Sequence, residues 1–406
     1  MEYEVSENIL LLEFLYKNIQ GKSKNNIKTL LKNGIYVNNI KTTRYDYKLK
    51  KGDIVKINSI QRIDEYNKLE IIYEDNELLV VNKPCNLLTV ATNKEKEKTN
   101  NDKPVVAEKK LKIIDEESNT RPYAVMINNI AVARKYQSGL DDAYIVYEMI
   151  VEGGITRLLA LYKDANVDRI GSVRSSRHYY LDYALENDAI YVHFGWSPQA
   201  QSDIKTLGIN NINGIYDDSA FVRESKLPVS WEHNAFTSTK KITAVAKNKG
   251  YRMTSDKDTL LNYSVDEISL ENEEEKQVAN KVDIKYSNSV ITNYEYNEKE
   301  KVYYRSVNNV EHTDYVTKKQ YTAKNIIIAY IDNSYISNDD KGRQNIDNIG
   351  SGIGYYITDG YAIPITWSKS GRKEQTVYKK KNGEEIKVND GNTYIQNAPS
   401  NSATIS

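Results

Sequence analysis

Apolar side chains recur along the first 60 positions with two different periods. Residues 9–19 and 27–31 carry them at helical spacing, which predicts two short helices. Strand patterns follow at 35–37 and 53–57, after the turn signal Asn33-Gly34. We therefore expect residues 1–59 to form a small helical module that ends in a short sheet.

Two apolar runs, at 69–73 and 78–81, flank a polar turn, and this pattern predicts a β-hairpin. Residues 92–112 hold almost no large apolar side chain, so this stretch cannot bury enough surface to offset its chain entropy. We expect a hairpin segment over 60–99 and a linker over 100–115.

Two larger regions follow. The first mixes strand and helix patterns, with strands expected at 123–126, 143–147, 158–162 and 189–194 and helices at 178–186 and 199–207. The second has strand periodicity throughout, with strands expected at 282–284, 302–306, 325–331, 354–358 and 361–367. We predict an α/β domain over 116–265, a linker over 266–280 and an antiparallel β domain over 281–400. The fold class of the whole chain is then α+β multidomain.

Composition narrows the classes of function. The 406 residues include 56 Lys and Arg against 56 Asp and Glu, so the total charge gives no argument for a nucleic acid or a membrane as partner. Cys85 is the single cysteine, which excludes an intrachain disulfide and a Cys-rich zinc site. The four histidines lack the spacing of metal ligands. We therefore expect no metal and no cofactor.

The apolar runs are short, far below the roughly 20 residues that a membrane helix needs. The N-terminus MEYEVSEN is acidic, whereas a secretory signal begins with basic residues. For the chain as written we therefore expect no signal peptide, no membrane span and a cytoplasmic location.

Charge is concentrated in one segment, residues 17–56, which carries eleven Lys and Arg against two Asp, a net charge of 11 − 2 = +9. Such a surface attracts a phosphate backbone, because each Lys near a phosphate releases a condensed counterion. The candidate RNA-binding residues are Lys22, Lys24, Lys28, Lys32, Lys41, Arg44, Lys50 and Lys51. The alternative is a lysine-rich face that is simply solvated.

The stretches KSKNNIKTLLKNGIYVNN (22–39) and YKLKKGDIV (47–55) resemble the small RNA-binding domain shared by a ribosomal small-subunit protein and many RNA-modifying enzymes. IIYEDNELLVVNKPCNLLTVAT (71–92) resembles the start of the catalytic domain of RluA-type pseudouridine synthases. This resemblance implies ribosomal RNA as partner and an aspartate, within a His-Arg-Leu-Asp motif, that acts on a flipped uridine. The chain has no such motif, and SGLDDA (138–143) lacks its arginine. We therefore expect no catalytic residue and no synthase activity.

Further stretches resemble the YerB family of bacterial lipoproteins, whose two parts are domains of unknown function. They are RPYAVMINN (121–129), QSGLDDAYIVYEMIVEGGITRLLALY (137–162), IGSVRSSRHYY (170–180), DAIYVHFGWSPQA (188–200) and GSGIGYYITDGYAIPITWSK (350–369). The resemblance covers residues from about 113 to 400. It implies an exported, lipid-anchored type of protein and supplies no reaction.

Polar residues near the predicted strand ends of this region suggest a site. They are Glu148, Glu152, Arg157, Arg174, Arg177 and His193. If the strand ends converge, these residues form a cleft for an anionic or sugar ligand, with the arginines as partners of a carboxylate or phosphate. A second interpretation is that the Arg and Glu side chains pair and fix loops. A third is a hydrolase, with Glu152 as acid and His193 as base.

Together these interpretations predict a non-catalytic fusion, near residues 99–102, of an RNA-binding module with an envelope-type module that binds a ligand or a protein. The alternative is a cell-envelope scaffold whose partners are cell-wall polymers or proteins. In that case the first 99 residues are a vestigial or chimeric synthase fragment.

Overall fold

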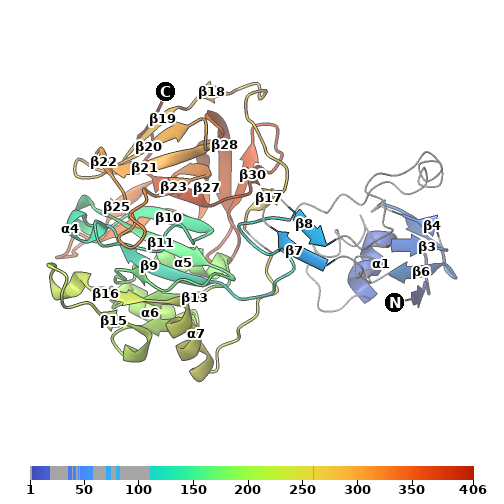
Figure 1. The fold of residues 1–406 in the computed structure, drawn as a ribbon, viewed down its shortest axis with the longest axis horizontal. Helices are drawn as coiled ribbons and strands as arrows, with labels where there is room; N and C mark the ends of the chain where they lie inside the picture. The colour runs from blue at the N-terminus through green and yellow to red at the C-terminus, as the bar shows by residue number, and fades with distance from the viewer. Residues whose placement is uncertain are drawn as a thin grey trace. The chain divides into compact units, whose positions relative to one another are not determined.

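The computed structural model describes residues 2–18, 35–38, 40–42, 44, 46–57, 70–74, 79–82, 110–258 and 260–406. The chain divides into two units, Met1–Lys109 and Lys110–Ser406. Figure 1 shows the helices and strands of both units.

In the first unit a helix packs against a small sheet. The elements are α1 (Leu11–Asn18), β1 (Glu2–Glu4), β2 (Ile9–Leu10), β3 (Ile35–Val37), β4 (Ile40–Lys41), β5 (Lys48–Leu49) and β6 (Ile54–Ile57). Strands β1, β6, β3 and β4 form an antiparallel sheet in that order, and β2 pairs with β5. Leu11, Phe14 and Leu15 share a core with Val37 and Val55, because their spacing puts them on one face of α1.

The other predictions for this unit fall partly outside the described residues. The predicted helix at 27–31 lies outside them, as do Lys22, Lys24, Lys28 and Lys32. The predicted hairpin is confirmed as an antiparallel pair of strands, β7 (Glu70–Glu74) and β8 (Leu79–Asn82).

The second unit is built on an eleven-stranded sheet in the order β14-β13-β9-β11-β10-β31-β24-β27-β28-β18, with β29 also paired to β28. The strands from the first half are β9 (Tyr123–Asn128), β10 (Ile145–Ile150), β11 (Thr156–Tyr162), β13 (Ile190–His193) and β14 (Asn211–Asn213). The strands from the second half are β18 (Gln277–Val278), β24 (Asn325–Tyr330), β27 (Gly350–Thr358), β28 (Tyr361–Lys369), β29 (Val377–Lys380) and β31 (Thr393–Ala398). Strands β9, β10 and β11 are buried along their whole length. This explains their unbroken apolar runs, since a strand covered on both faces does not alternate.

The two regions that the sequence separates at 266–280 share this sheet. Strand β10 pairs in parallel with β31, which places Ile145 opposite Thr393 and Met149 opposite Asn397. Strand β24 also runs parallel to β31, so the expectation of a purely antiparallel second region is wrong. The physical reason is that β31 lies between β10 of the first half and β24 of the second half, and it runs parallel to both. The coarse class stands, because the chain is mostly β with few helices and several sheets.

A six-stranded antiparallel sheet contacts the large one. Its strands are β19 (Lys281–Lys285), β20 (Ile291–Asn297), β21 (Val302–Val307), β22 (Val310–Glu311), β23 (Thr322–Ala323) and β32 (Ala403–Ile405). Side chains of β20 and β21 form hydrogen bonds with Glu148 of β10, and Tyr294 of β20 accepts one from Gln396 of β31. We call this contact, between β10 and β31 on one side and β20 and β21 on the other, the seam.

Short helices and small sheets complete the second unit. The helices are α4 (Ala131–Arg134), α5 (Tyr180–Glu186), α6 (Pro198–Thr206) and α7 (Thr239–Asn248), with single turns η3 (Glu152–Gly154), η4 (Asp218–Ala220) and η5 (Trp231–His233). The remaining strands are β12 (Ile170–Gly171), β15 (Val222–Arg223), β16 (Ala235–Thr237), β17 (Asn262–Ser264), β25 (Asn333–Tyr335), β26 (Gln344–Ile346) and β30 (Lys387–Asn389). Ser197 and Ser238 cap α6 and α7, because each side chain accepts a hydrogen bond from a first-turn N–H. Within the described parts of the chain, no helix has the length and apolar character to cross a bilayer.

Candidate functional site

Several strand ends meet at one edge of the large sheet. Strand β13 runs parallel to both β9 and β14, so Asn128, His193 and Asn213 end their strands at the same edge. Strand β11 is antiparallel to β9 and starts there, with Arg157 opposite Asn128. We call this the carboxyl edge. Ligands of sheets with parallel strands commonly bind just beyond such an edge.

Three of the predicted site residues come together at this edge. Glu152 accepts hydrogen bonds from Arg157 Nη2 at 3.1 Å and from Arg177 Nε at 2.8 Å, and Arg177 Nη2 also contacts it. Burial raises the pKa of Glu152, but the hydrogen bond from Arg177 and the charge of Arg157 outweigh it and lower the pKa to about 2. Arg157 and Arg177 also donate to the carbonyls of Ser175 and Ser176. This geometry supports the second interpretation, in which Arg and Glu pairs fix loops.

Arg174 lies on the same loop but has a different partner. Its Nη2 donates to Glu232 Oε2 at 3.0 Å, and its Nη1 donates to the Glu232 carbonyl at 3.0 Å. The backbone of Arg174 bonds to Met126 and Phe194, so the loop lies across the ends of β9 and β13. Arg174 is therefore a neighbour of the Glu152 cluster without being part of it.

Glu148 does not face the carboxyl edge. Its side chain is 0% exposed and forms an ion pair with the equally buried Arg305 of β21, with Nη2 and Oε2 2.9 Å apart. Thr156 donates to the same carboxylate at 2.7 Å and Asn129 at 3.1 Å. The expectation that Glu148 helps to form a cleft is corrected, because β10 directs this side chain into the seam.

His193 is a buried residue of the strand end. Its Nδ1 lies 2.8 Å from the Gly195 carbonyl, and its Nε2 lies 3.1 Å from Asn211 Oδ1. Burial lowers its pKa to about 4, so the ring is neutral near pH 7. Among residues 110–258 and 260–406 no hydrogen bond joins His193 to Glu152. With a pKa of about 2, Glu152 is a carboxylate near neutral pH, which gives the acid role no support.

A groove opens beside His193, where β13 and β14 end. It has a volume of about 480 Å³ and lies between α6, the end of β14 and the end of α7. Its polar and aromatic lining consists of Trp196, Gln201, Lys205, Asn211, Asn213, Tyr216, Asp217 and Lys249. Gly195 has a φ of 81°, a conformation that suits glycine, and this turn leads the chain from β13 to Trp196. We call this hollow the edge groove.

Asn213 lines this groove and has a buried donor that lacks a partner among the described residues. Its side chain is 2% exposed, and its Oδ1 accepts the backbone N–H groups of Gly195 at 3.0 Å and Ile215 at 3.1 Å. Its Nδ2 has no hydrogen-bond partner among the described residues. A buried donor without a partner costs about 1–3 kcal/mol, so an Asn that lines a hollow is suited to a ligand. None of the groove residues is among the predicted site residues, although WSPQA after a strand contains Trp196 and the helix cap Ser197.

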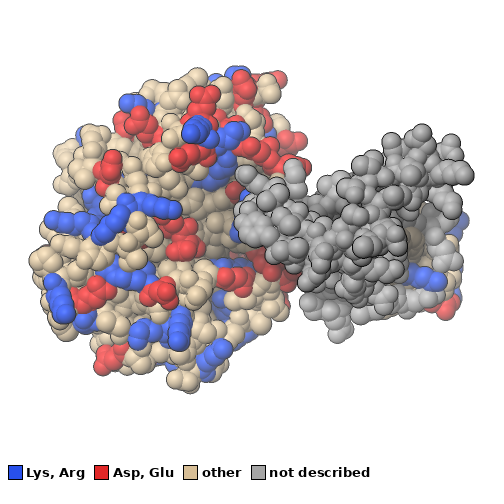
Figure 2. Space-filling model, in the orientation of Figure 1, with Lys and Arg blue, Asp and Glu red and all other residues tan. Residues whose placement is uncertain are grey.

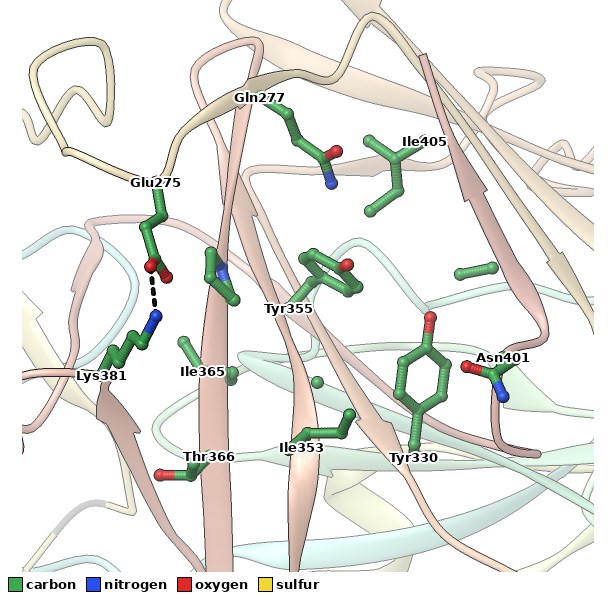
Figure 3. Close-up of a pocket in the computed structure, with 13 residues that line it drawn as sticks. Glu275, Gln277, Tyr330, Ile353, Tyr355, Ile365, Thr366, Lys381, Asn401 and Ile405 are labelled. Carbon is green, nitrogen blue, oxygen red and sulfur yellow. Dashed lines mark hydrogen bonds and ion pairs between the residues drawn. The ribbon is translucent and has the colours of Figure 1, made fainter.

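A second hollow has a different character. It has a volume of about 550 Å³ and lies on β24, β27 and β28 beside β32. Figure 3 shows Tyr330, Tyr355, Ile353 and Ile365 around it, with a Glu275–Lys381 ion pair at the rim. The unpartnered buried polar atoms of the described residues do not line it. It is therefore a mainly apolar hollow with little chemistry to select a ligand.

Of the predicted RNA-binding residues, those with described side chains are Arg44, Lys50 and Lys51, and all three are exposed. Arg44 pairs with Asp46 at 2.9 Å. Lys41 belongs to β4. In the described parts of the chain, no three His, Cys, Asp or Glu side chains gather as metal ligands.

Comparison with known proteins gives matches that lie in the second unit. The N-terminal domain of a protein family of unknown function, DUF3048, matches residues 111–252, and its C-terminal domain matches residues 282–395. The candidate lipoprotein YerB of Bacillus subtilis (strain 168) is 34% identical over 295 residues, which are 71% of this chain and 84% of the relative. The crystal structure of the YerB protein from Bacillus subtilis has a TM-score of 0.62 at 32% identity and covers 71% of this chain and 94% of the solved chain.

Proposed function

We propose, from the premise that this chain belongs to the DUF3048 family of proteins of unknown function, that its second unit is a non-catalytic ligand-binding module of the cell envelope. The name of its relative, a candidate lipoprotein, supports the envelope as its place of action. The ligand binds in the edge groove. The residues Glu152, Arg157 and Arg177 hold the loop that covers the neighbouring strand ends.

One observation carries this proposal: Asn213 lines the edge groove, and its buried Nδ2 donor has no hydrogen-bond partner among the described residues. Tyr216 supports it, because its ring is 70% exposed on the groove wall beside Trp196. Exposed aromatic rings at a polar hollow are typical of binding sites, since a ligand covers the apolar surface that water does not solvate well.

Sedimentation with insoluble bacterial cell-wall material tests the proposal. The full chain should sediment with the material, and Tyr216→Ala should reduce the bound fraction several-fold. Tyr335→Ala is the matched control, since Tyr335 is 72% exposed in β25 and does not line the groove. Equal binding of the two variants, or no sedimentation of the unaltered chain, would contradict the proposal.

We further propose that the first unit is a non-catalytic RNA-contacting module and that the chain is a fusion. The support is the net charge of +9 over residues 17–56 and the exposure of Lys50 and Lys51 at a turn. A Lys50→Glu/Lys51→Glu double variant should elute from immobilised ribosomal RNA at lower salt than the unaltered chain, because fewer counterions are released on binding. The charge-matched control is Lys318→Glu/Lys319→Glu in the second unit. Elution that does not depend on salt would remove this proposal.

A further inference from the structure

We infer that the edge groove takes a neutral saccharide, with a pyranose ring against Trp196 and Tyr216 and its polar groups toward Asn213 and Asp217. This inference rests on the proposed function, because it names the ligand class of the same groove. It follows from the rings, the hydrogen-bonding groups and the charge of the groove.

Two neighbouring aromatic residues line the groove. Trp196 and Tyr216 have ring centroids 5.8 Å apart at an interplanar angle of 46°. Trp196 also lies near His193, at 5.6 Å between centroids, and His193 is stacked on Tyr191 at 5.0 Å. A ring that already packs against protein, as Trp196 does, loses little freedom when a ligand binds to it. The C–H face of a pyranose is a flat apolar surface that fits against such rings.

The polar groups of the groove both donate and accept. Asn213 Nδ2 is a free donor among the described residues. Asp217 accepts from the Asn213 backbone N–H at 2.8 Å and from Lys249 Nζ at 2.8 and 3.0 Å. A carboxylate has about four acceptor positions, so this one retains acceptor capacity. A sugar hydroxyl both donates and accepts, which matches this pairing of donor and acceptor.

The groove has little charge for a charged ligand to pair with. Its ionisable lining residues are Lys205, Asp217 and Lys249; Asp217 neutralises Lys249, and the one remaining charge is on Lys205, which is exposed to solvent. The arginines that would suit a phosphate or carboxylate, Arg157 and Arg177, are already bound to Glu152. Basic and acidic side chains are also interspersed on the face of the second unit that Figure 2 shows. The volume of about 480 Å³ falls within the usual range for small-molecule sites, about 300–1,000 Å³.

Tryptophan fluorescence reports on the groove directly. The chain has three tryptophans: Trp196 lines the groove, Trp367 is buried, and Trp231 is exposed outside the groove. In a full-length Trp231→Phe background, titration with chitotriose or maltotriose should give a saturable change in emission. Sodium polyphosphate, as an anionic probe, should give none.

Asn213→Asp is the discriminating variant. The aspartate keeps an oxygen for the N–H groups of Gly195 and Ile215 but removes the Nδ2 donor. Binding of the trisaccharide should weaken about tenfold. Tyr216→Ala, at an exposed position where folding is not at stake, should weaken it by a similar factor, and Tyr335→Ala should leave it unchanged.

Three results would overturn the inference: no saturable response to either trisaccharide at millimolar concentration, a saturable response to polyphosphate instead, or unchanged affinity in both Asn213→Asp and Tyr216→Ala. If the chain still sediments with cell-wall material in a way that depends on Tyr216, and neither trisaccharide changes the emission, the proposed function stands and only the ligand class is wrong. If sedimentation also fails, the proposed function falls with it.

Discussion

The seam and the edge groove are both rich in polar side chains, but they differ in how these side chains are satisfied. In the seam, the Glu148 carboxylate is bound by Arg305, Thr156, Thr292 and Asn129 with no exposure to solvent. In the groove, the side chain of Asn213 bonds to the described residues only through its oxygen. Arg305 Nε and His312 Nδ1 also lack partners among the described residues, but neither lines a hollow described above. Polar groups whose partners are all protein groups stabilise the fold. A donor that lacks a partner, in a residue that lines a hollow, indicates a ligand.

The largest expected effect comes from breaking the seam. Arg305→Met leaves Glu148 as a buried charge without its cation, and such a change costs about 3–5 kcal/mol of unfolding free energy. Urea unfolding followed by tryptophan emission measures it. The double variant Glu148→Gln/Arg305→Met should lose less than Arg305→Met alone, because no buried charge remains. A single variant as stable as the double one would show that the pair does not hold the seam.

The Glu152 cluster should show an intermediate effect that depends on pH. Its folded pKa of about 2 lies below the ordinary 4.5, so its stabilisation is complete above about pH 4.5 and is lost as pH falls toward 2. Glu152→Gln should therefore cost on the order of 2–3 kcal/mol at pH 7. The difference in unfolding free energy between the two proteins should shrink below pH 4.5. A difference that stays constant down to pH 3 would contradict the depressed pKa.

Two substitutions at Asn213 separate the role of its oxygen, which accepts two backbone N–H groups, from the role of its Nδ2 as a donor. Asn213→Leu leaves the N–H groups of Gly195 and Ile215 without their acceptor, and we expect a loss of about 2 kcal/mol in unfolding free energy. Asn213→Asp keeps that acceptor but buries a carboxylate next to Asp217, so its loss of unfolding free energy should shrink as the pH is lowered toward about 4 and the new carboxyl takes up a proton. Thermal unfolding of both variants measures this. A loss for Asn213→Leu no larger than that for Asn213→Asp near pH 4 would mean that the N–H groups of Gly195 and Ile215 do not need this acceptor.

The smallest effect is expected for Tyr216→Ala. The residue is exposed, so removal of its ring should leave the unfolding free energy within about 0.5 kcal/mol of that of the unaltered chain. Binding should still fall, as described above. A clear loss of stability would place Tyr216 with the seam residues, as a group that holds the fold.

Local pattern was sufficient for much of the fold. Strands were predicted at the places of the buried β9, β10 and β11 and of β27 and β28, although the observed β27 begins at Gly350, four residues before the predicted start. Helix α7 was missed, although Ile242, Val245 and Ala246 give it a helical spacing after the capping Ser238. Strand β31 was missed because its burial depends on contacts with distant segments. Its polar Thr393 and Gln396 are buried through hydrogen bonds to the distant Asn325 and Tyr294, and no local pattern specifies them.

The site was also predicted only in part, because some of its contacts join residues that are far apart in the sequence. Arg157, Arg177 and Glu152 were expected to meet, because charged residues beside Gly153 and Gly154 at a strand end indicate a loop cluster. The ion pair of Glu148 with Arg305 joins residues 157 positions apart, which sequence spacing cannot reveal. Asn213 stands in the stretch NNING, where nothing distinguishes it from its neighbours. Only the coordinates show that its buried amide nitrogen has no partner among the described residues and that the residue lines the groove.

The parallel pairing of β10 with β31 also constrains how the chain is made. A ribosome completes β10 about 250 residues before β31 emerges. Strand β24, which pairs with the other edge of β31, is also made before it. Until β31 is inserted, both strands have an open edge that another copy of the chain can occupy. Such late closure between distant segments slows folding. Chains cut short before residue 393 should therefore aggregate during synthesis, and the full-length protein should depend on a chaperone that shields those edges.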